Sequence, residues 1–148
     1  MRTVLKKFSE LSVADLYELL RLRSLIFHVE QNCAYCDLDN KDQNALHLMG
    51  YDEKSNLVAY ARILPAGISY KEVSIGRVVT AAGYRGKGAG KEIMKASLKI
   101  IQELYGNVPV RIGAQCYLDK FYRELGFVPQ GDQYLEDNIP HIEMLKKG

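Results

Sequence analysis

The chain of 148 residues has the length of one domain, and its 47% apolar and 26% charged residues are typical of a globular protein with a full core. A net charge of +2 argues against nucleic acid as a partner, which would favour a basic stripe on the surface. No apolar run reaches membrane-spanning length, and the amino-terminal stretch MRTVLKKFSE lacks the apolar core of a secretory signal. The 3 cysteines are an odd number and predict no disulfide framework. We therefore expect a single domain over residues 1–148, located in the cytoplasm and without a membrane partner.

A long helix is predicted near the amino end of the chain. Ser12 begins it, and Asp15 stands three residues later as the partner of a capping box. The helix should run to about Val29 and lead into a polar, irregular loop, residues 31–42, of a length that is often functional. Apolar residues at helical spacing predict its buried face: Val13, Leu16, Tyr17, Leu20 and Phe27.

The rest of the chain alternates between strands and helices. Residues 45–51 and 57–64 form two runs, the second with period-two alternation, joined by a short polar stretch, which predicts a hairpin. A second helix begins after Gly88, and a short third helix ends at Gly126, a position where glycine is favoured. The remaining strands are predicted at residues 4–8, 73–79, 108–114, 127–128 and 139–145.

A glycine-rich loop separates the strand that begins at Val73 from the second helix, and residues 85–91 read Arg-Gly-Lys-Gly-Ala-Gly-Lys. Glycine lets the backbone approach a ligand closely, and the free N–H groups and dipole of a first helical turn attract anions. The loop therefore predicts a phosphate site. A Walker A loop would need glycine at 85 and serine or threonine at 92, where the chain has Arg85 and Glu92. A dinucleotide fingerprint that begins at Gly86 meets Lys91 in place of its last glycine.

Arg-x-x-Gly-x-Gly at 85–90, after a strand and before a helix, resembles the acetyl-coenzyme A signature of the GCN5-related N-acetyltransferases (GNAT). The segment FYRELGF at 121–127 resembles the FYxxLGF segment of the same family, one strand further along the chain. Several amino-terminal residues, among them Arg23, Glu30 and His47, resemble the ElaA branch of this superfamily. The resemblance covers the whole chain and implies a single GNAT domain of α/β (α+β) class, with a central mixed sheet of about six or seven strands flanked by helices.

The resemblance implies that the chain transfers the acetyl group of acetyl-coenzyme A to a primary amine of a small molecule or peptide, by direct attack in a ternary complex. The backbone of Val78 and Val79 would hold the pantetheine arm and polarise the thioester carbonyl. Arg23, Glu30 and His47 would belong to the pocket of the acceptor amine. The other cofactor-binding residues implied are Arg85, Gly86, Lys87, Gly88, Ala89, Gly90 and Lys91 around the pyrophosphate, and Gln115, Leu118 and Phe121 along the slot.

Two residues are predicted to move protons. Tyr122 matches the position of the family's usual general acid, beside the departing sulfur. A thiolate with thiol pKa near 8.5 is less basic than a phenolate near 10, so donation from an ordinary tyrosine is uphill by about 2 kcal/mol. The role therefore needs a lowered tyrosine pKa, or an amine proton that reaches the sulfur by another path. A primary amine with pKa near 10.4 is protonated at pH 7, and its deprotonation costs about 4.6 kcal/mol. His141 is the predicted base because histidine titrates near neutral pH; Glu143, Glu30 and His47 are the alternatives.

Other interpretations stay open. A non-catalytic acyl-CoA-binding or sensor module of the same fold is the alternative to an enzyme. Cys116, near the expected slot, is the residue that could carry an acyl group and contradict direct transfer. Cys33 and Cys36 with His28 and His47 could supply four zinc ligands, but a second close-set pair is missing and we predict no metal. An exposed edge strand near the carboxyl end would allow a homodimer.

Overall fold

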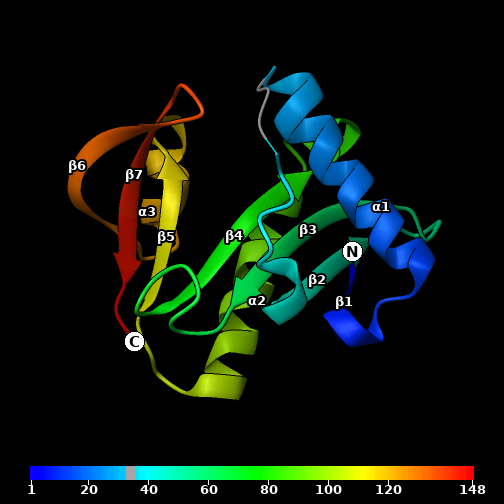
Figure 1. The fold of residues 1–148 in the computed structure, drawn as a ribbon, viewed down its shortest axis with the longest axis horizontal. Helices are drawn as coiled ribbons and strands as arrows, with labels where there is room; N and C mark the ends of the chain where they lie inside the picture. Colours follow the sequence, from blue (N-terminus) through cyan, green and yellow to red (C-terminus); the bar gives the residue numbers. More distant parts are fainter. Residues whose placement is uncertain (33–35) are drawn as a thin grey trace.

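The computed structural model describes residues 1–32 and 36–148, which form seven strands and three α-helices (Figure 1). The predicted order β-α-β-β-β-α-β-α-β-β is confirmed. In the described part of the chain, no helix combines the length and the apolar character needed to cross a membrane. The strands are β1 (Arg2–Lys7), β2 (Leu46–Tyr51), β3 (Leu57–Leu64), β4 (Val73–Thr80), β5 (Val110–Gln115), β6 (Val128–Glu136) and β7 (Ile139–Lys146). The helices are α1 (Val13–Ser24), which continues as the π-helical segment η2 (Leu25–Glu30), α2 (Ala89–Tyr105) and α3 (Asp119–Glu124).

The seven strands form one mixed sheet in the order β1-β2-β3-β4-β5-β7-β6, in agreement with the predicted fold class. Neighbouring strands are antiparallel except β4 and β5, which are parallel. α1 covers one face of the sheet and α2 the other (Figure 1). Because successive side chains of a strand point to opposite faces, β3 is buried on both sides: Tyr60 packs with α1, whereas Ala59 and Ala61 pack with α2.

The predicted cap of α1 is confirmed, and its predicted buried face is confirmed only in part: Phe27 is buried, and Leu16 and Leu20 are partly buried against the core. The Asp15 N–H donates to Ser12 Oγ (2.9 Å), and the Ser12 N–H donates to the Asp15 carboxylate (3.0 Å). Val13 and Tyr17, however, are 88% and 72% exposed. Arg23 lies in the middle of the face that is buried. A search for apolar residues at helical spacing treats arginine as exposed, so it misses an arginine that is buried together with its ion-pair partners. The residues that α1 and η2 bury are Leu19, Leu22, Arg23, Ile26 and Phe27.

β6 and β7 form a hairpin at the carboxyl end of the sheet. Asp137 and Asn138 connect them with φ of 51° and 62°, which suits the two-residue turns of tight hairpins. The predicted strand at residues 127–128 is too short, since β6 continues to Glu136 with an irregular register between Gln130 and Tyr134. β6 is an edge strand of the sheet, and the homodimer stays a prediction.

Candidate active site

The two parallel strands in the middle of the sheet separate toward one end (Figure 1), and a cleft lies between them there. β4 and β5 pair only at Val73 with Val110 and at Ser74 with Arg111, and then diverge. A cavity of about 690 Å³ lies between them, bordered also by η2, the start of α2, α3 and the β6–β7 turn. From Ile75 onward, the side of β4 that faces the cavity has no register with β5, so it can pair with an extended ligand as if with another strand.

β4 has a bulge beside this cavity. Its register with β3 shifts so that Ala61 faces both Arg77 and Val78. Arg77 adopts φ of +49°, a left-handed conformation that costs about 1–3 kcal/mol in a residue other than glycine and is concentrated at functional sites. Bulges bend a strand and redirect its backbone. Val78 and Val79, the residues predicted to hold the pantetheine arm, both line the cavity.

The glycine-rich loop closes one end of the cavity. Gly86 and Gly88 have φ of +76° and +79°, where a side chain would be strained, and Gly88 is the N-cap of α2. The Glu92 N–H donates to the Gly88 carbonyl (3.0 Å), so the amides before Glu92 have no partner within the helix. These amides and the helix dipole suit an anion. Lys87 lies outside the cavity, 5.4 Å from the centre of the Tyr84 ring. The other predicted phosphate residues line it: Arg85, Gly86, Gly88, Ala89, Gly90 and Lys91.

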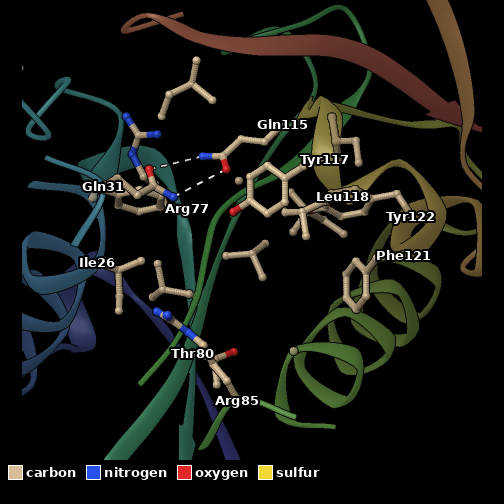
Figure 2. A pocket seen from close by; sticks show the side chains of 18 of the residues that line it. Ile26, Gln31, Arg77, Thr80, Arg85, Gln115, Tyr117, Leu118, Phe121 and Tyr122 are labelled. Carbon is tan, nitrogen blue, oxygen red and sulfur yellow. Dashed lines mark hydrogen bonds between the residues drawn. The ribbon is translucent and has the colours of Figure 1, made fainter. Parts of the chain in front are cut away.

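The opposite wall comes from the end of β5 and from α3. Gln115, Leu118 and Phe121, which the resemblance assigned to the cofactor slot, all line the cavity. The amides of Gln115 and Gln31 exchange hydrogen bonds across the cavity at 3.3 and 3.5 Å (Figure 2). This glutamine pair therefore joins the end of η2 to the end of β5 above the space between the strands.

Tyr122 lines the cavity from α3 and is 8% exposed. Its ring makes edge-on contacts with Phe121 and Phe127, at centroid distances of 5.1 and 6.0 Å. Burial, with a smaller contribution from Tyr117, raises the pKa of the Tyr122 hydroxyl to about 12. The lowered pKa that the predicted acid role needs is therefore not found, because the surrounding apolar rings cannot stabilise a phenolate.

His141 lines the cavity at the start of β7 and is 6% exposed. Its Nδ1 lies 2.7 Å from the Ile139 carbonyl oxygen, which can only accept, so Nδ1 carries a proton. Nε2 is therefore the nitrogen that can gain or lose a proton, and it lies 3.3 Å from Glu136 Oε2, with which it forms an ion pair when the ring is protonated. The Tyr134 ring stacks on the imidazole at a centroid distance of 5.8 Å. The structure thus holds one tautomer of His141, with its basic nitrogen directed toward another cavity-lining residue.

Arg23 and His47, which the resemblance assigned to the acceptor pocket, lie in the interior and do not line the cavity. Arg23 donates to Asp37 Oδ2 through Nε (2.7 Å) and to Asp42 Oδ1 through Nη1 (2.8 Å). His47 Nε2 donates to the Asp42 carbonyl oxygen (2.9 Å), and its Nδ1 accepts from the Tyr60 hydroxyl (2.6 Å). Burial lowers the pKa of His47. With both ring nitrogens engaged, His47 is available neither as a base nor as a zinc ligand.

Glu30, the third residue assigned to that pocket, does line the cavity, and its carboxylate pairs with the Arg85 guanidinium. The cavity also has charged residues that the sequence reasoning missed, Arg77, Glu136 and Asp137. The sequence could have indicated the position of Glu136 and Asp137, because the pair Asp137-Asn138 between two predicted strands is typical of a hairpin turn. No local pattern marked Arg77.

The cysteines that the structure describes do not line the cavity. Cys116 begins the short 3-10 helix η5 (Cys116–Leu118), and it is not among the described residues that line the cavity. Cys36 is exposed. Cys33, which the zinc alternative requires, lies outside the described residues.

Comparison with known proteins agrees with this geometry. Residues 23–147 match the model of the acetyltransferase (GNAT) domain. The protein ElaA of Escherichia coli strain K12 is 43% identical over 141 residues, which cover 94% of this chain and 92% of ElaA, and the crystal structure of Escherichia coli ElaA superposes with a TM-score of 0.91. An acyl-CoA N-acyltransferase from Pseudomonas aeruginosa is 36% identical, covers 99% of both chains and has a TM-score of 0.91. An aminoglycoside 6′-N-acetyltransferase complexed with coenzyme A is 16% identical, covers 97% of this chain and 96% of its own, and shares the fold with a TM-score of 0.72.

Proposed function

Because this chain belongs to the GNAT acetyltransferase family and has its acyl-CoA N-acyltransferase fold, we propose that it transfers the acetyl group of acetyl-coenzyme A to a primary amine. The amine attacks the thioester directly in a ternary complex, without an acyl-enzyme. The observation that carries the proposal is the separation of β4 from β5 beside an anion-binding glycine loop. That combination offers a strand edge for a pantetheine arm and unpaired amides for a pyrophosphate.

The cofactor lies along β4 in this proposal. Its pantetheine amides pair with the backbone of Val78 and Val79 beyond the bulge at Arg77. One N–H of this segment donates to the thioester oxygen as negative charge develops there. The amides of Gly88 to Lys91 hold the pyrophosphate, as a helix N-terminus holds anions in other proteins.

The acceptor enters beside the β6–β7 turn. Glu136 and Asp137 line the cavity there and attract an amine that arrives protonated at neutral pH. His141 Nε2 removes the proton, because its other nitrogen is already a donor to the Ile139 carbonyl oxygen. Glu136 then stabilises the imidazolium that forms, since Oε2 lies 3.3 Å from Nε2.

Tyr122 acts on the leaving group. Full transfer of its proton to a thiolate of thiol pKa near 8.5 is uphill by about 4.8 kcal/mol when its own pKa is about 12. Tyr122 therefore stays protonated and donates a hydrogen bond to the departing sulfur, and the proton released by the amine completes the thiol. This is a weaker form of the acid role that the resemblance implied.

Thermal stability with acetyl-coenzyme A, ATP or NAD at matched concentration tests the proposal. A ligand at about 100 times its dissociation constant adds about 2.7 kcal/mol, enough to raise the melting temperature by several degrees. We expect stabilisation by acetyl-coenzyme A alone, followed by thiol release when primary amines are added. Stabilisation by ATP or NAD and not by acetyl-coenzyme A would overturn the proposal.

A further inference from the structure

Glu30 and Arg85 form an ion pair across the mouth of the cavity. Glu30 is the last residue of η2, and Arg85 precedes the glycines of the loop before α2. Both line the cavity, and their side chains are 39% and 45% exposed, so solvent reaches the pair from outside. The pair joins two segments that are 55 positions apart in the sequence.

This ion pair opposes cofactor binding. Arg85 is the first cation of the loop proposed to hold the pyrophosphate, and in the free protein a carboxylate neutralises it. The same carboxylate repels an approaching phosphate. A pyrophosphate carries more charge than one carboxylate and offers paired oxygens to the guanidinium fork, so it would compete with Glu30 for Arg85.

A displaced Glu30 keeps its place at the edge of the cavity. Its neighbour in the chain, Gln31, is hydrogen-bonded to Gln115 across the cavity (Figure 2). These hydrogen bonds hold the end of η2 beside the cavity. The second arginine of the cavity wall, Arg77, lies 2.8 Å from Asp37 Oδ1 and is engaged there. Lys91, another cation of the cavity wall, belongs to the loop proposed to hold the pyrophosphate. The incoming group with a charge that matches the released carboxylate is then the acceptor amine.

We propose that Glu30 is exchanged between two cations: it holds Arg85 in the free protein and binds the ammonium group of the acceptor once the cofactor has taken Arg85. The inference rests on the proposed function and adds a residue and an order of events to it. Cofactor binding raises the affinity for a cationic amine, and by linkage the amine raises the affinity for the cofactor. Glu30 is thus a binding residue for the acceptor and a competitor of the cofactor.

The test is a Glu30→Gln variant studied in two binding steps. Coenzyme A is titrated by calorimetry at low salt, and the KM of a primary amine is measured at saturating acetyl-coenzyme A. We expect coenzyme A to bind about twofold to fivefold more tightly, the range for the loss of one exposed ion pair, while the KM for the amine rises. Tighter cofactor binding together with weaker acceptor binding is a result that general damage to the site does not produce.

Two controls make the result specific. Glu103→Gln removes the same charge from an exposed position on α2 outside the cavity, and should leave both constants unchanged. In an Arg85→Gln background, Glu30→Gln should no longer tighten coenzyme A, because the competition acts through Arg85. Since Glu30 is exposed, the variant should fold, and Glu30→Ala provides a second version of the same test.

The outcomes separate the inference from the proposed function. If the wild-type chain binds coenzyme A but Glu30→Gln binds it equally or less tightly, the exchange is refuted and the proposed function stands. Equal tightening with and without Arg85 also refutes it, because the effect is then general electrostatic repulsion. If the wild-type chain does not bind coenzyme A at all, both the exchange and the proposed function are overturned.

Discussion

The pH dependence of a His141→Gln variant tests the proposed base most directly. At pH 7 only about 1 in 2,500 molecules of a primary amine is unprotonated, which corresponds to about 4.6 kcal/mol. With His141 as base the protonated amine can bind and lose its proton in the site, and a positioned base typically contributes about 10²–10⁴-fold. Glutamine fills similar space and cannot take the proton. We expect kcat/KM at pH 7 to fall by about 10²–10³-fold.

The size of the defect should change with pH. The variant depends on amine that is already unprotonated in solution, so its kcat/KM should rise about tenfold per unit from pH 7 toward 10, and the defect should shrink accordingly. Thiol release from acetyl-coenzyme A, corrected for spontaneous hydrolysis at each pH, measures this. Tyr122→Phe is the matched control: its defect should stay constant over this range, because the pKa of Tyr122 is about 12. A His141→Gln defect that is the same at about pH 7 and about pH 9.5 would refute the base role.

Four further changes probe other parts of the site and fold. Tyr122→Phe should lower kcat by about tenfold to a hundredfold while coenzyme A affinity holds, because phenylalanine keeps the edge-on ring contacts. Gly88→Ala forces a side chain to φ of +79° at the N-cap of α2, and calorimetry should show weaker binding of coenzyme A by about fivefold or more. Cys116→Ala should keep the full rate; a loss of activity would point to an acyl-enzyme. Burial would raise the pKa of Asp39, but Arg62 outweighs it and lowers that pKa to about 2. The ionised Asp39 carboxylate therefore stabilises the fold at pH values above the unfolded pKa near 3.9, and this contribution is lost as pH falls through about 2. The urea midpoint of unfolding should fall less between about pH 7 and about pH 3 in Asp39→Asn than in the wild type.

The glycine loop at the end of the cavity could be predicted from the sequence because its geometry is local. Glycines at 86 and 88 have positive φ, and the proposed anion site consists of backbone amides that the first turn of a helix leaves without partners. The spacing of a few neighbouring residues is therefore enough to predict this loop. The strand separation that makes room for the ligand is not local, since it depends on where the pairing of β4 and β5 stops.

The acceptor side could not be predicted in the same way. Arg23, Glu30 and His47 have residue types that suit an amine pocket, yet only Glu30 reaches the cavity. A charged or titratable residue is recognised as structural only when its partners are known. Those of His47 are the Tyr60 hydroxyl and a backbone carbonyl of residue 42, and neither contact has a sequence signature.

The ion pairs of Asp37 with Arg23 and Arg77 illustrate how such structural charges position the site. Arg77, at the bulge of β4, lies 2.8 Å from Asp37, an ion pair without hydrogen-bond geometry, and Asp37 also accepts from Arg23 of α1. Such pairs are weak evidence for stability, but removing one partner leaves a buried charge uncompensated, so the pairs fix geometry. They tie Asp37 to Arg77, the residue whose left-handed backbone lies at the bulge before Val78. Asp37, Arg23 of α1 and the strand proposed to hold the thioester are therefore positioned by the same charges, although Arg23 and Asp37 lie outside the cavity.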